Sequence, residues 1–416
     1  MRLEDNIYFA GENTVTSVCN QFGTPLYLYD SDKIVEQIKT FKQAFNWPKL
    51  KVKFAMKSLS NISILKLMKA HGVELDAVSL YEAETGFFAG YKPSQIMYTP
   101  SGVKFEELEE GVLKGYQINV DNLSTLEKFG EKYGNTVPCC LRINPHIKAG
   151  GNHKIQTGHK DSKFGISLLQ IDQILEITKK YDIVINGLHM HTGSEIYEVE
   201  PYIEGAKVLF KLAQNFADLD FIDFGSGFKV AYKEGDKVTD LKKLGESLVA
   251  EFSAFCDSYG KELEMWFEPG KFLVSESGVL LVRANVVKQT PYSTFVGVDS
   301  GLNHLIRPMM YDSYHEIVNV SNPAGKIQNY NVVGYICETD TFAWDRPLNE
   351  VREGDILAIK NAGAYGFSMS SNYNSRPRPA EALIVNGTPQ LIRNRETMQD
   401  ILKNQIDIFQ EEEIKV

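Results

Sequence analysis

Between residues 50 and 270 of this 416-residue chain, short β-rich segments alternate with segments of helical periodicity. This alternation constrains the fold more than any other feature, because parallel strands need crossover connections, which are usually helices. Eight such units over roughly 220 residues are typical of a TIM-type (β/α)8 barrel. The predicted strands are Lys51–Met56, Glu74–Val78, Gln95–Thr99, Gln117–Val120, Pro138–Ile143, Ile185–Met190, Phe221–Phe224 and Met265–Phe267.

Apolar spacing predicts helices between these strands. Residues 61–70 place four apolar side chains at helical spacing, and Gly72 follows as a stop. A second stripe runs from Phe105 to Leu113 and is followed by Gly115. Ile171, Ile174 and Leu175 repeat the pattern later in the chain. These segments supply the crossovers that the barrel requires.

After about residue 275 the pattern changes, and β-like runs separated by turn residues predict a second, mostly β domain. The predicted barrel domain is residues 26–274, and residues 1–25 and 275–416 form the second domain. Thr24-Pro25 is interpreted as the crossing into the barrel. The acidic tail, Gln410–Val416, is expected to fray. The predicted runs are Val279–Val287, Ser293–Val298, Tyr330–Ile336 and Ile356–Ile359.

Charge and cysteine usage narrow the class of protein. The net charge is -10 and no run of Lys and Arg forms a basic patch, so we expect no nucleic-acid partner. The five cysteines are irregularly spaced, which argues against a disulfide framework and suits a reducing cytosol. Met1–Ala10 contains no apolar core of a signal peptide, and no stretch is long enough to span a bilayer. We therefore expect a cytoplasmic protein without a membrane partner.

Lys57 follows three hydrophobic residues at the predicted end of the first strand. Functional residues of TIM barrels lie at the C-terminal ends of strands. Desolvation there would lower the pKa of the amine and favour the neutral form that a Schiff base requires. The alternative is an ordinary exposed lysine.

His189 and His191 close the sixth predicted strand and point to the same face of it, because side chains alternate along a strand. Three interpretations are open. The pair could bind a metal, one histidine could stack on a planar cofactor, or both could be hydrogen-bonded polar residues inside the barrel.

Two more motifs follow the last two predicted strands. Gly225-Ser226-Gly227 could let backbone amides approach a phosphate, although a tight turn alone would also need glycine. Glu268 begins the segment Glu-Pro-Gly-Lys and could bind a metal, act as a base or pair with a protonated ring nitrogen, unless Pro-Gly simply forms a turn. An amine, a stacking residue, a phosphate turn and a carboxylate at one barrel mouth together match the needs of pyridoxal 5'-phosphate.

With these motifs the chain resembles the fold-type III pyridoxal-phosphate-dependent decarboxylases, whose fold is alanine racemase-like. Within this family it is most similar to the diaminopimelate branch. The resemblance covers nearly the whole chain. In the first domain it rests on Lys53-Phe54-Ala55-Met56-Lys57-Ser58, Arg142-Ile143-Asn144-Pro145, Ser162-Lys163-Phe164-Gly165, His191-Thr192-Gly193-Ser194, Gly225-Ser226-Gly227-Phe228 and Glu268-Pro269-Gly270-Lys271. In the second it rests on Val298-Asp299-Ser300-Gly301, Arg307-Pro308-Met309-Met310-Tyr311, Cys337-Glu338-Thr339-Asp340 and Gly363-Ala364-Tyr365-Gly366, with the blocks that follow to Glu381.

The resemblance implies decarboxylation of meso-2,6-diaminopimelate to L-lysine and CO2, the last step of lysine biosynthesis. It also implies a homodimer with shared active sites and no metal. The catalytic residues that it implies are Lys57, Cys337, Glu268 and His191. The implied cofactor contacts are Lys57, His191, Ser194, Gly225, Gly227, Glu268, Pro269, Gly270, Lys271 and Tyr365. The implied substrate contacts are Lys271, Arg307, Tyr311, Glu338 and Tyr365.

Two residues depart from the family pattern. Ser226 replaces the middle residue of a triple-glycine loop, which narrows the backbone freedom of that turn. Lys271 replaces an arginine, which keeps the charge and loses the planar bidentate fork. The replacement of arginine by Lys271 affects the expected contact with the substrate more than the expected reaction.

Three alternatives remain open to sequence reasoning. The first is a related decarboxylase for ornithine, arginine or carboxynorspermidine. The second is a barrel metallohydrolase that uses His189 and His191, although this would leave Lys57 unexplained. The third is a non-catalytic pyridoxal-phosphate carrier, against which the long β-rich extension argues.

Overall fold

The computed structural model describes residues 1–147, 150–151 and 157–408, which divide into two compact units. One unit comprises Asp30–Gly278 with Asn361–Ser368, and the other contains the remaining residues. The predicted tail Gln410–Val416 lies outside the described residues. In the described part of the chain, no helix is both long and apolar enough to cross a membrane.

The first unit is a closed barrel of eight parallel strands, as predicted. Its strand order runs from β9 through β11, β12, β13, β5, β6 and β7 to β8, and β8 pairs with β9 to close the ring. A short strand, β10 (Ile166–Ser167), pairs in parallel with the carboxyl end of β9. The barrel strands are β5 (Leu50–Ala55), β6 (Glu74–Ala77), β7 (Ile96–Tyr98), β8 (Gln117–Val120), β9 (Cys139–Asn144), β11 (Ile185–Met190), β12 (Phe221–Asp223) and β13 (Glu264–Phe267).

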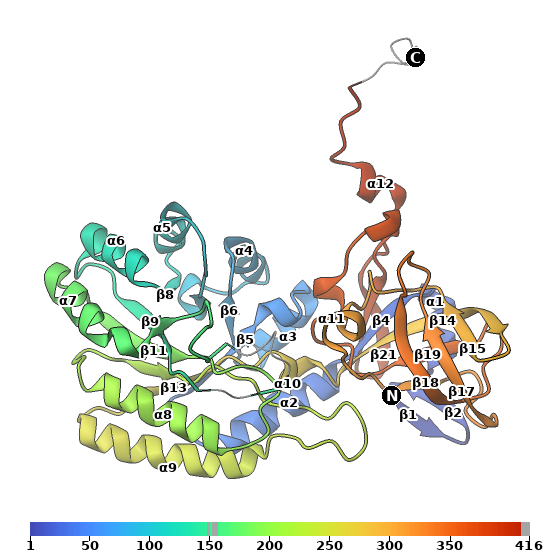
Figure 1. Ribbon diagram of the computed structural model, residues 1–416, viewed down its shortest axis with the longest axis horizontal. Helices are drawn as coiled ribbons and strands as arrows, with labels where there is room; N and C mark the ends of the chain where they lie inside the picture. The colour runs from blue at the N-terminus through green and yellow to red at the C-terminus, as the bar shows by residue number, and fades with distance from the viewer. Residues whose placement is uncertain (148–149, 152–156, 409–416) are drawn as a thin grey trace. The chain divides into compact units, whose positions relative to one another are not determined.

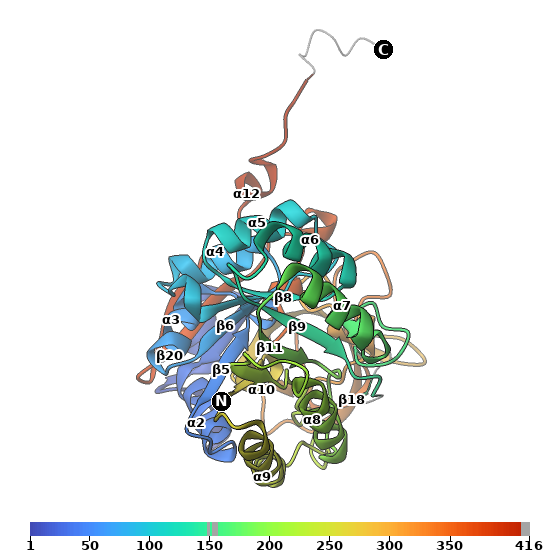
Figure 2. The ribbon, with the colours of Figure 1, turned by 90° about the vertical axis from the view of Figure 1, so that its left-hand side faces the viewer.

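Helices surround the strands in the ring that Figure 2 shows. The predicted helix at residues 61–70 is confirmed as α3 (Ile62–Ala70), which begins where the Asn61 side chain accepts a hydrogen bond from the Ser63 amide. Gly72 follows it with a φ of 66°, which a residue with a side chain rarely adopts. The other crossover and flanking helices are α2 (Ser31–Ala44), α4 (Leu80–Phe88), α5 (Phe105–Leu113), α6 (Leu123–Tyr133), α7 (Ile171–Tyr181), α8 (Glu200–Ala213), α9 (Leu241–Tyr259) and α10 (Lys271–Val274).

The second unit is mostly β, as predicted. Its main sheet has the order β18, β17, β15, β14, β4, β20, β21, and β19 pairs with both β14 and β16. Its elements are β1 (Arg2–Glu4), β2 (Ile7–Ala10), β3 (Asn13–Thr14), α1 (Val15–Phe22), β4 (Leu26–Asp30), β14 (Gly278–Gln289), β15 (Thr294–Val298), α11 (Arg307–Tyr311), β16 (Ile317–Asn319), β17 (Ile327–Val333), β18 (Thr341–Asn349), β19 (Ile356–Ile359), β20 (Ala380–Val385), β21 (Thr388–Arg393) and α12 (Met398–Leu402). Figure 1 shows these elements.

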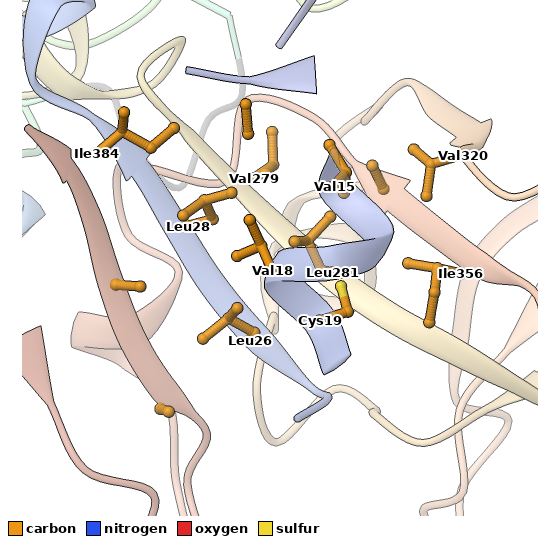
Figure 3. Packing of buried hydrophobic residues seen from close by; sticks show 14 residues of the cluster. Val15, Val18, Cys19, Leu26, Leu28, Val279, Leu281, Val320, Ile356 and Ile384 are labelled. Atoms are coloured by element: carbon orange, nitrogen blue, oxygen red, sulfur yellow. The ribbon is translucent and has the colours of Figure 1, made fainter. Parts of the chain in front are cut away.

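The core of the β-rich unit joins segments that are far apart in sequence. Val18 on α1 and Leu28 on β4 belong to one buried cluster with Leu281 on β14 and Ile356 on β19 (Figure 3). Burying side chains of this kind stabilises the fold by about 1.5–3 kcal/mol each. The amino-terminal segment is therefore part of this sheet's hydrophobic core.

Candidate active site

A pocket opens at the C-terminal ends of the barrel strands, where the sequence predicted the site. Residues from several different strands and the turns that follow them line it. The lining residues are Ala55, Lys57, Asp76, Val78, Thr99, Arg142, His191, Ser194, Ser226, Gly227, Phe228, Glu268, Pro269, Gly270, Lys271, Phe272 and Tyr365.

Lys57 lies in this pocket, one short turn beyond the position that was predicted. Strand β5 ends at Ala55, and Met56–Ser58 form a 3-10 turn that carries Lys57 past the strand end. Its Nζ donates to Oδ2 of Asp76 at 3.0 Å. Of the Lys57 side chain 42% is exposed, so the amine is open to the pocket.

The expected low pKa of Lys57 is wrong. Desolvation does lower the pKa, but the interactions with Asp76, Tyr365 and Glu268 outweigh it and raise the pKa above its usual value. Sequence position alone could not show this, because Asp76 lies on the neighbouring strand β6. The free amine is therefore held as a cation by its carboxylate neighbour.

Glu268 is a buried carboxylate that stays ionised. Burial raises its pKa, but the His189 imidazole and the Lys57 ammonium outweigh burial and hold it well below the usual range. Its Oε2 lies 3.1 Å from Nε2 of His189. Among the described residues, its second oxygen, Oε1, has no hydrogen-bond partner. One carboxylate oxygen is thus available to a group in the pocket.

His189 and His191 take different positions although they are two residues apart. His189 is buried beside Glu268. His191 lies just beyond β11, lines the pocket and accepts the Ser226 amide at its Nδ1, at 3.3 Å. Burial and the Arg142 charge lower the pKa of His191 to about 3, so its ring is neutral at physiological pH. The two rings share no ligand position: the buried group that could hold a metal contains His189, Asp223 and Glu268.

The glycine turn after β12 closely approaches neighbouring backbone. Gly225 and Gly227 have φ values of 64° and 114°, a region that side chains disfavour. A Cβ on Gly225 would lie 2.3 Å from the Met190 carbonyl oxygen, and one on Gly227 would lie 2.2 Å from that of Gly193. Ser226 sits between them and lines the pocket. The departure at Ser226 is therefore compatible with the turn, because the two positions that require glycine keep it.

Lys271 and Tyr365 complete the pocket wall. Lys271 is the first residue of α10, and 8% of its side chain is exposed. Its Nζ donates to Glu195 Oε1 at 3.0 Å, so this buried cation already has a carboxylate partner. The backbone of Tyr365 is bound to the turn that carries Lys57, because its amide donates to the Ser58 carbonyl at 2.9 Å.

The remaining predicted site residues lie in the β-rich unit. Arg307 and Tyr311 are at the two ends of α11, with the guanidinium 6.0 Å from the centre of the tyrosine ring. Cys337 is exposed after β17, and its amide donates to the Asn374 side chain at 3.3 Å. Glu338 accepts a short hydrogen bond from Tyr373.

Sequence reasoning missed several charged residues of the pocket. Asp76 and Arg142 both line it, and they lie on β6 and β9. Asp223 is buried at the end of β12, next to the glycine turn. A charged residue near the carboxyl end of an otherwise apolar strand is the pattern that could have identified Arg142 and Asp223.

These groups fit pyridoxal phosphate. The amine of Lys57 can bond to an aldehyde, and the available Oε1 of Glu268 can accept a ring N–H. The turn at Gly225 and Gly227 brings backbone close enough to hold a phosphate. The neutral His191 ring offers a face for stacking.

Residues 31–275 match the pyridoxal-dependent decarboxylase family in its pyridoxal-binding domain. Diaminopimelate decarboxylase of Methanothermobacter thermautotrophicus is 35% identical over 405 residues, covering 95% of this chain and 94% of that protein. The enzyme of the same name from Escherichia coli K12 is 35% identical over 401 residues, covering 92% and 94%.

Solved structures agree with the sequence relatives. Diaminopimelate decarboxylase from Helicobacter pylori, in complex with L-lysine, has a TM-score of 0.86 at 32% identity, covering 93% of this chain and 98% of that one. The enzyme from M. jannaschii, also with L-lysine, has a TM-score of 0.89 at 28% identity and covers 98% of both chains.

Proposed function

This chain belongs to the pyridoxal-dependent decarboxylase family, and we propose that it converts meso-2,6-diaminopimelate to L-lysine and CO2 with pyridoxal phosphate as cofactor. In this reaction one α-carbon loses its carboxylate as CO2 and gains a proton. The observation that carries the proposal is the juxtaposition of Lys57, Glu268, His191 and the glycine turn in one pocket of a chain whose near full-length relatives are diaminopimelate decarboxylases.

Lys57 would bind the aldehyde carbon of the cofactor through Nζ. When Nζ is not bound to the cofactor, it donates to Asp76, which would hold the free amine at 3.0 Å beside the pocket. The amides around Gly225 and Gly227, with the Ser194 hydroxyl, would hold the phosphate, and Tyr365, which also lines the pocket, would contact it. His191 would hold the plane of the ring by stacking on it.

Pyridoxal phosphate, when bound, supplies an electron sink for the carbon that loses CO2. Glu268 would sustain this sink, because its charged Oε1 favours a proton on the ring nitrogen. At about 3 Å in a medium of effective dielectric near 20, such a pair gains several kcal/mol. Pro269 and Gly270, which follow this carboxylate in the chain, also line the pocket.

The α-carbon must then receive a proton, and we assign this donor to Cys337. Its thiol can give a proton from Sγ and recover it from solvent, since Cys337 is exposed in the chain as described. This role requires the Cys337–Glu338 segment to reach an active site.

The far end of the substrate carries an ammonium and a carboxylate, so both charges are needed to bind it. Arg307, Lys271 and Tyr311 would hold the carboxylate, and Glu338 and Tyr365 would complete the contacts. Lys271 would share its ammonium between the substrate and Glu195, to which it is already paired. Replacement of Lys271 by Arg should lower KM for meso-diaminopimelate, because the guanidinium can engage both carboxylates.

We further propose a homodimer in which Cys337 and Glu338 complete the site of the partner subunit. A mixing experiment tests this more sharply than size alone. Lys57→Ala and Cys337→Ala variants, each inactive, are denatured and refolded together in equal amounts. If the two subunits share their active sites, about half of the refolded dimers contain one subunit of each variant, and each of these mixed dimers has one intact site out of two. About a quarter of wild-type activity should therefore return. No recovery, or a fully active monomer by light scattering, would contradict the proposal.

Substrate identity is tested by release of CO2 from meso-diaminopimelate, compared with lysine, ornithine and arginine. We expect turnover of the first and little of the others, because they lack the distal carboxylate that Lys271 and Arg307 would bind. Preferred turnover of ornithine would instead assign the chain to the related decarboxylases. Residues 26–274 remain the proposed barrel domain apart from Leu26–Tyr29, which belong to the β-rich unit because β4 pairs in its sheet. We propose the cytoplasm as the site of action.

A further inference from the structure

A buried group that includes Glu268 contains two further side chains to which the proposed reaction gives no role. It consists of His189 at the end of β11, Asp223 at the end of β12 and Glu268 after β13. All three side chains are buried, and one ligand atom from each lies within 4.8 Å of the other two. They come from three neighbouring barrel strands.

The polar atoms of this group are only partly paired. His189 Nε2 lies 3.1 Å from Glu268 Oε2, and because a carboxylate only accepts, the imidazole carries the proton of that hydrogen bond. Asp223 Oδ1 accepts the amide of Gly225 at 2.8 Å, which ties the group to the glycine turn. Among the described residues, Glu268 Oε1, Asp223 Oδ2 and His189 Nδ1 have no partner.

Two carboxylates this close cannot both be charged at low cost. Burial and the charge of Glu268 raise the pKa of Asp223 well above its usual value, which favours the protonated form of this acid. Glu268 keeps the charge, and the hydrogen bond from His189 is the contact that separates these two otherwise similar acids.

We propose that His189 is a positioning residue: by donating to Oε2 it keeps Glu268 ionised and leaves Oε1 as the single oxygen that faces the ring nitrogen of the cofactor. The inference rests on the proposed function, because it assigns Glu268 to that nitrogen. Asp223, which holds the Gly225 amide, keeps the glycine turn in register with the same carboxylate.

The proton between Glu268 and the ring nitrogen of the cofactor should depend on His189. With His189 in place, Glu268 is a charged acceptor and the ring nitrogen carries the proton. Without His189, desolvation favours a neutral Glu268, whose hydroxyl can only donate to an unprotonated ring nitrogen. The protonation state of the ring nitrogen therefore reports on His189 directly, whatever the rate of the reaction.

The test uses holoenzyme reconstituted with pyridoxal phosphate labelled with 15N in the ring. In the wild type we expect the nitrogen resonance of a protonated ring. His189→Leu should move it toward the unprotonated value and lower kcat by about tenfold to a hundredfold, as expected for loss of one hydrogen bond to a charged group. His189→Gln, whose amide can still donate to Oε2, should restore most of the shift and of kcat.

A matched control is His304→Leu. His304 is also buried and hydrogen-bonded, to Ser300 and to the Pro377 carbonyl, but lies in the β-rich unit. Its replacement should leave the nitrogen resonance unchanged. If His189→Leu does not fold, His189→Asn serves in its place, because that amide is too short to reach Oε2.

The outcomes separate cleanly. A wild-type nitrogen resonance in His189→Leu, even with a lower kcat, would overturn the inference. Loss of the cofactor from both His189→Leu and His189→Gln would also overturn it, because His189 would then be needed to bind the cofactor at all. Stoichiometric zinc uptake by the wild-type holoenzyme that the Leu variant lost would overturn it in favour of a metal site. Failure of the wild type to form any pyridoxyl adduct at Lys57 on reduction would reject the proposed function instead.

Discussion

Two lysines near one strand of the barrel have opposite electrostatic behaviour, although each is bonded to an acid of the neighbouring strand. Lys53 on β5 donates to Glu74, and Lys57, just beyond β5, donates to Asp76. The two acids are two residues apart on β6. Burial lowers the pKa of Lys53 despite Glu74, whereas the pKa of Lys57 is raised.

The difference lies in what surrounds each ammonium. The Lys53 side chain is 0% exposed, lies 4.1 Å from the centre of the Trp266 ring and also donates to Gln117. Lys57 opens into a pocket whose other walls are acidic at Asp76 and Glu268. The two ion pairs thus have different roles. The Lys53–Glu74 pair lies in the barrel interior, and the Lys57–Asp76 pair holds an amine that is open to the pocket.

The largest effect should come from Lys57→Ala. The variant should lack the visible absorbance of the bound cofactor and lose at least about a thousandfold in kcat/KM, equivalent to about 4 kcal/mol. Mass spectrometry of the borohydride-reduced wild type should place the pyridoxyl adduct on Lys57, and the Lys53→Met variant should carry the same adduct. An adduct on Lys53, or on neither residue, would remove the distinction between the two lysines.

Lys53→Met should act on stability instead. It leaves the Glu74 carboxylate in the barrel wall without its cation, and breaking a buried pair in this way costs about 3–5 kcal/mol of unfolding free energy. Urea denaturation of the apoprotein would measure the loss. The double variant Lys53→Met with Glu74→Leu should regain most of it, because no unpaired charge remains. A single variant as stable as the wild type would show that this pair does not support the barrel.

Periodicity was sufficient to predict the barrel but not every strand of the β-rich unit. The eight parallel strands are almost wholly buried, so each reads as a short apolar run between helices. In contrast, β18 (Thr341–Asn349) and β21 (Thr388–Arg393) were not predicted. Both carry several exposed side chains, and pairing across the sheet rather than an apolar pattern makes them strands.

The site shows the same division. Lys57, His191 and Glu268 could be identified because each lies near a strand end within a local motif. Asp76 could not be connected to Lys57, since the register that places Ala55 opposite Asp76 is a property of the folded sheet. The sign of the Lys57 pKa shift depends on that partner, so burial alone predicted the wrong direction.

Asp76→Asn should change the pH dependence of cofactor capture by a moderate amount. Asp76 raises the pKa of Lys57, so its removal lowers that pKa and increases the neutral fraction at any pH below it. A fall of one unit would make covalent capture of pyridoxal phosphate by the apoprotein about tenfold faster near pH 7.5. Stopped-flow absorbance from pH 6 to pH 10 would measure this.

The matched control for that experiment is Glu74→Gln, which alters the partner of Lys53 alone. Its capture rate should follow the wild-type pH profile, because the charged groups that act most strongly on the pKa of Lys57 are Asp76 and Glu268. A shift of the profile in both variants would mean that the two ion pairs are electrostatically one group.

The smallest effect should come from Lys51→Met, at the outer end of the same strand. Lys51 pairs with Glu264 at 3.1 Å, but 34% and 30% of the two side chains are exposed. Water screens a pair of this kind, and such pairs contribute about 0–1 kcal/mol. Urea denaturation should therefore place Lys51→Met close to the wild type and well above Lys53→Met. If Lys51→Met were instead as destabilising as Lys53→Met, burial would not be the variable that distinguishes the lysines of this strand.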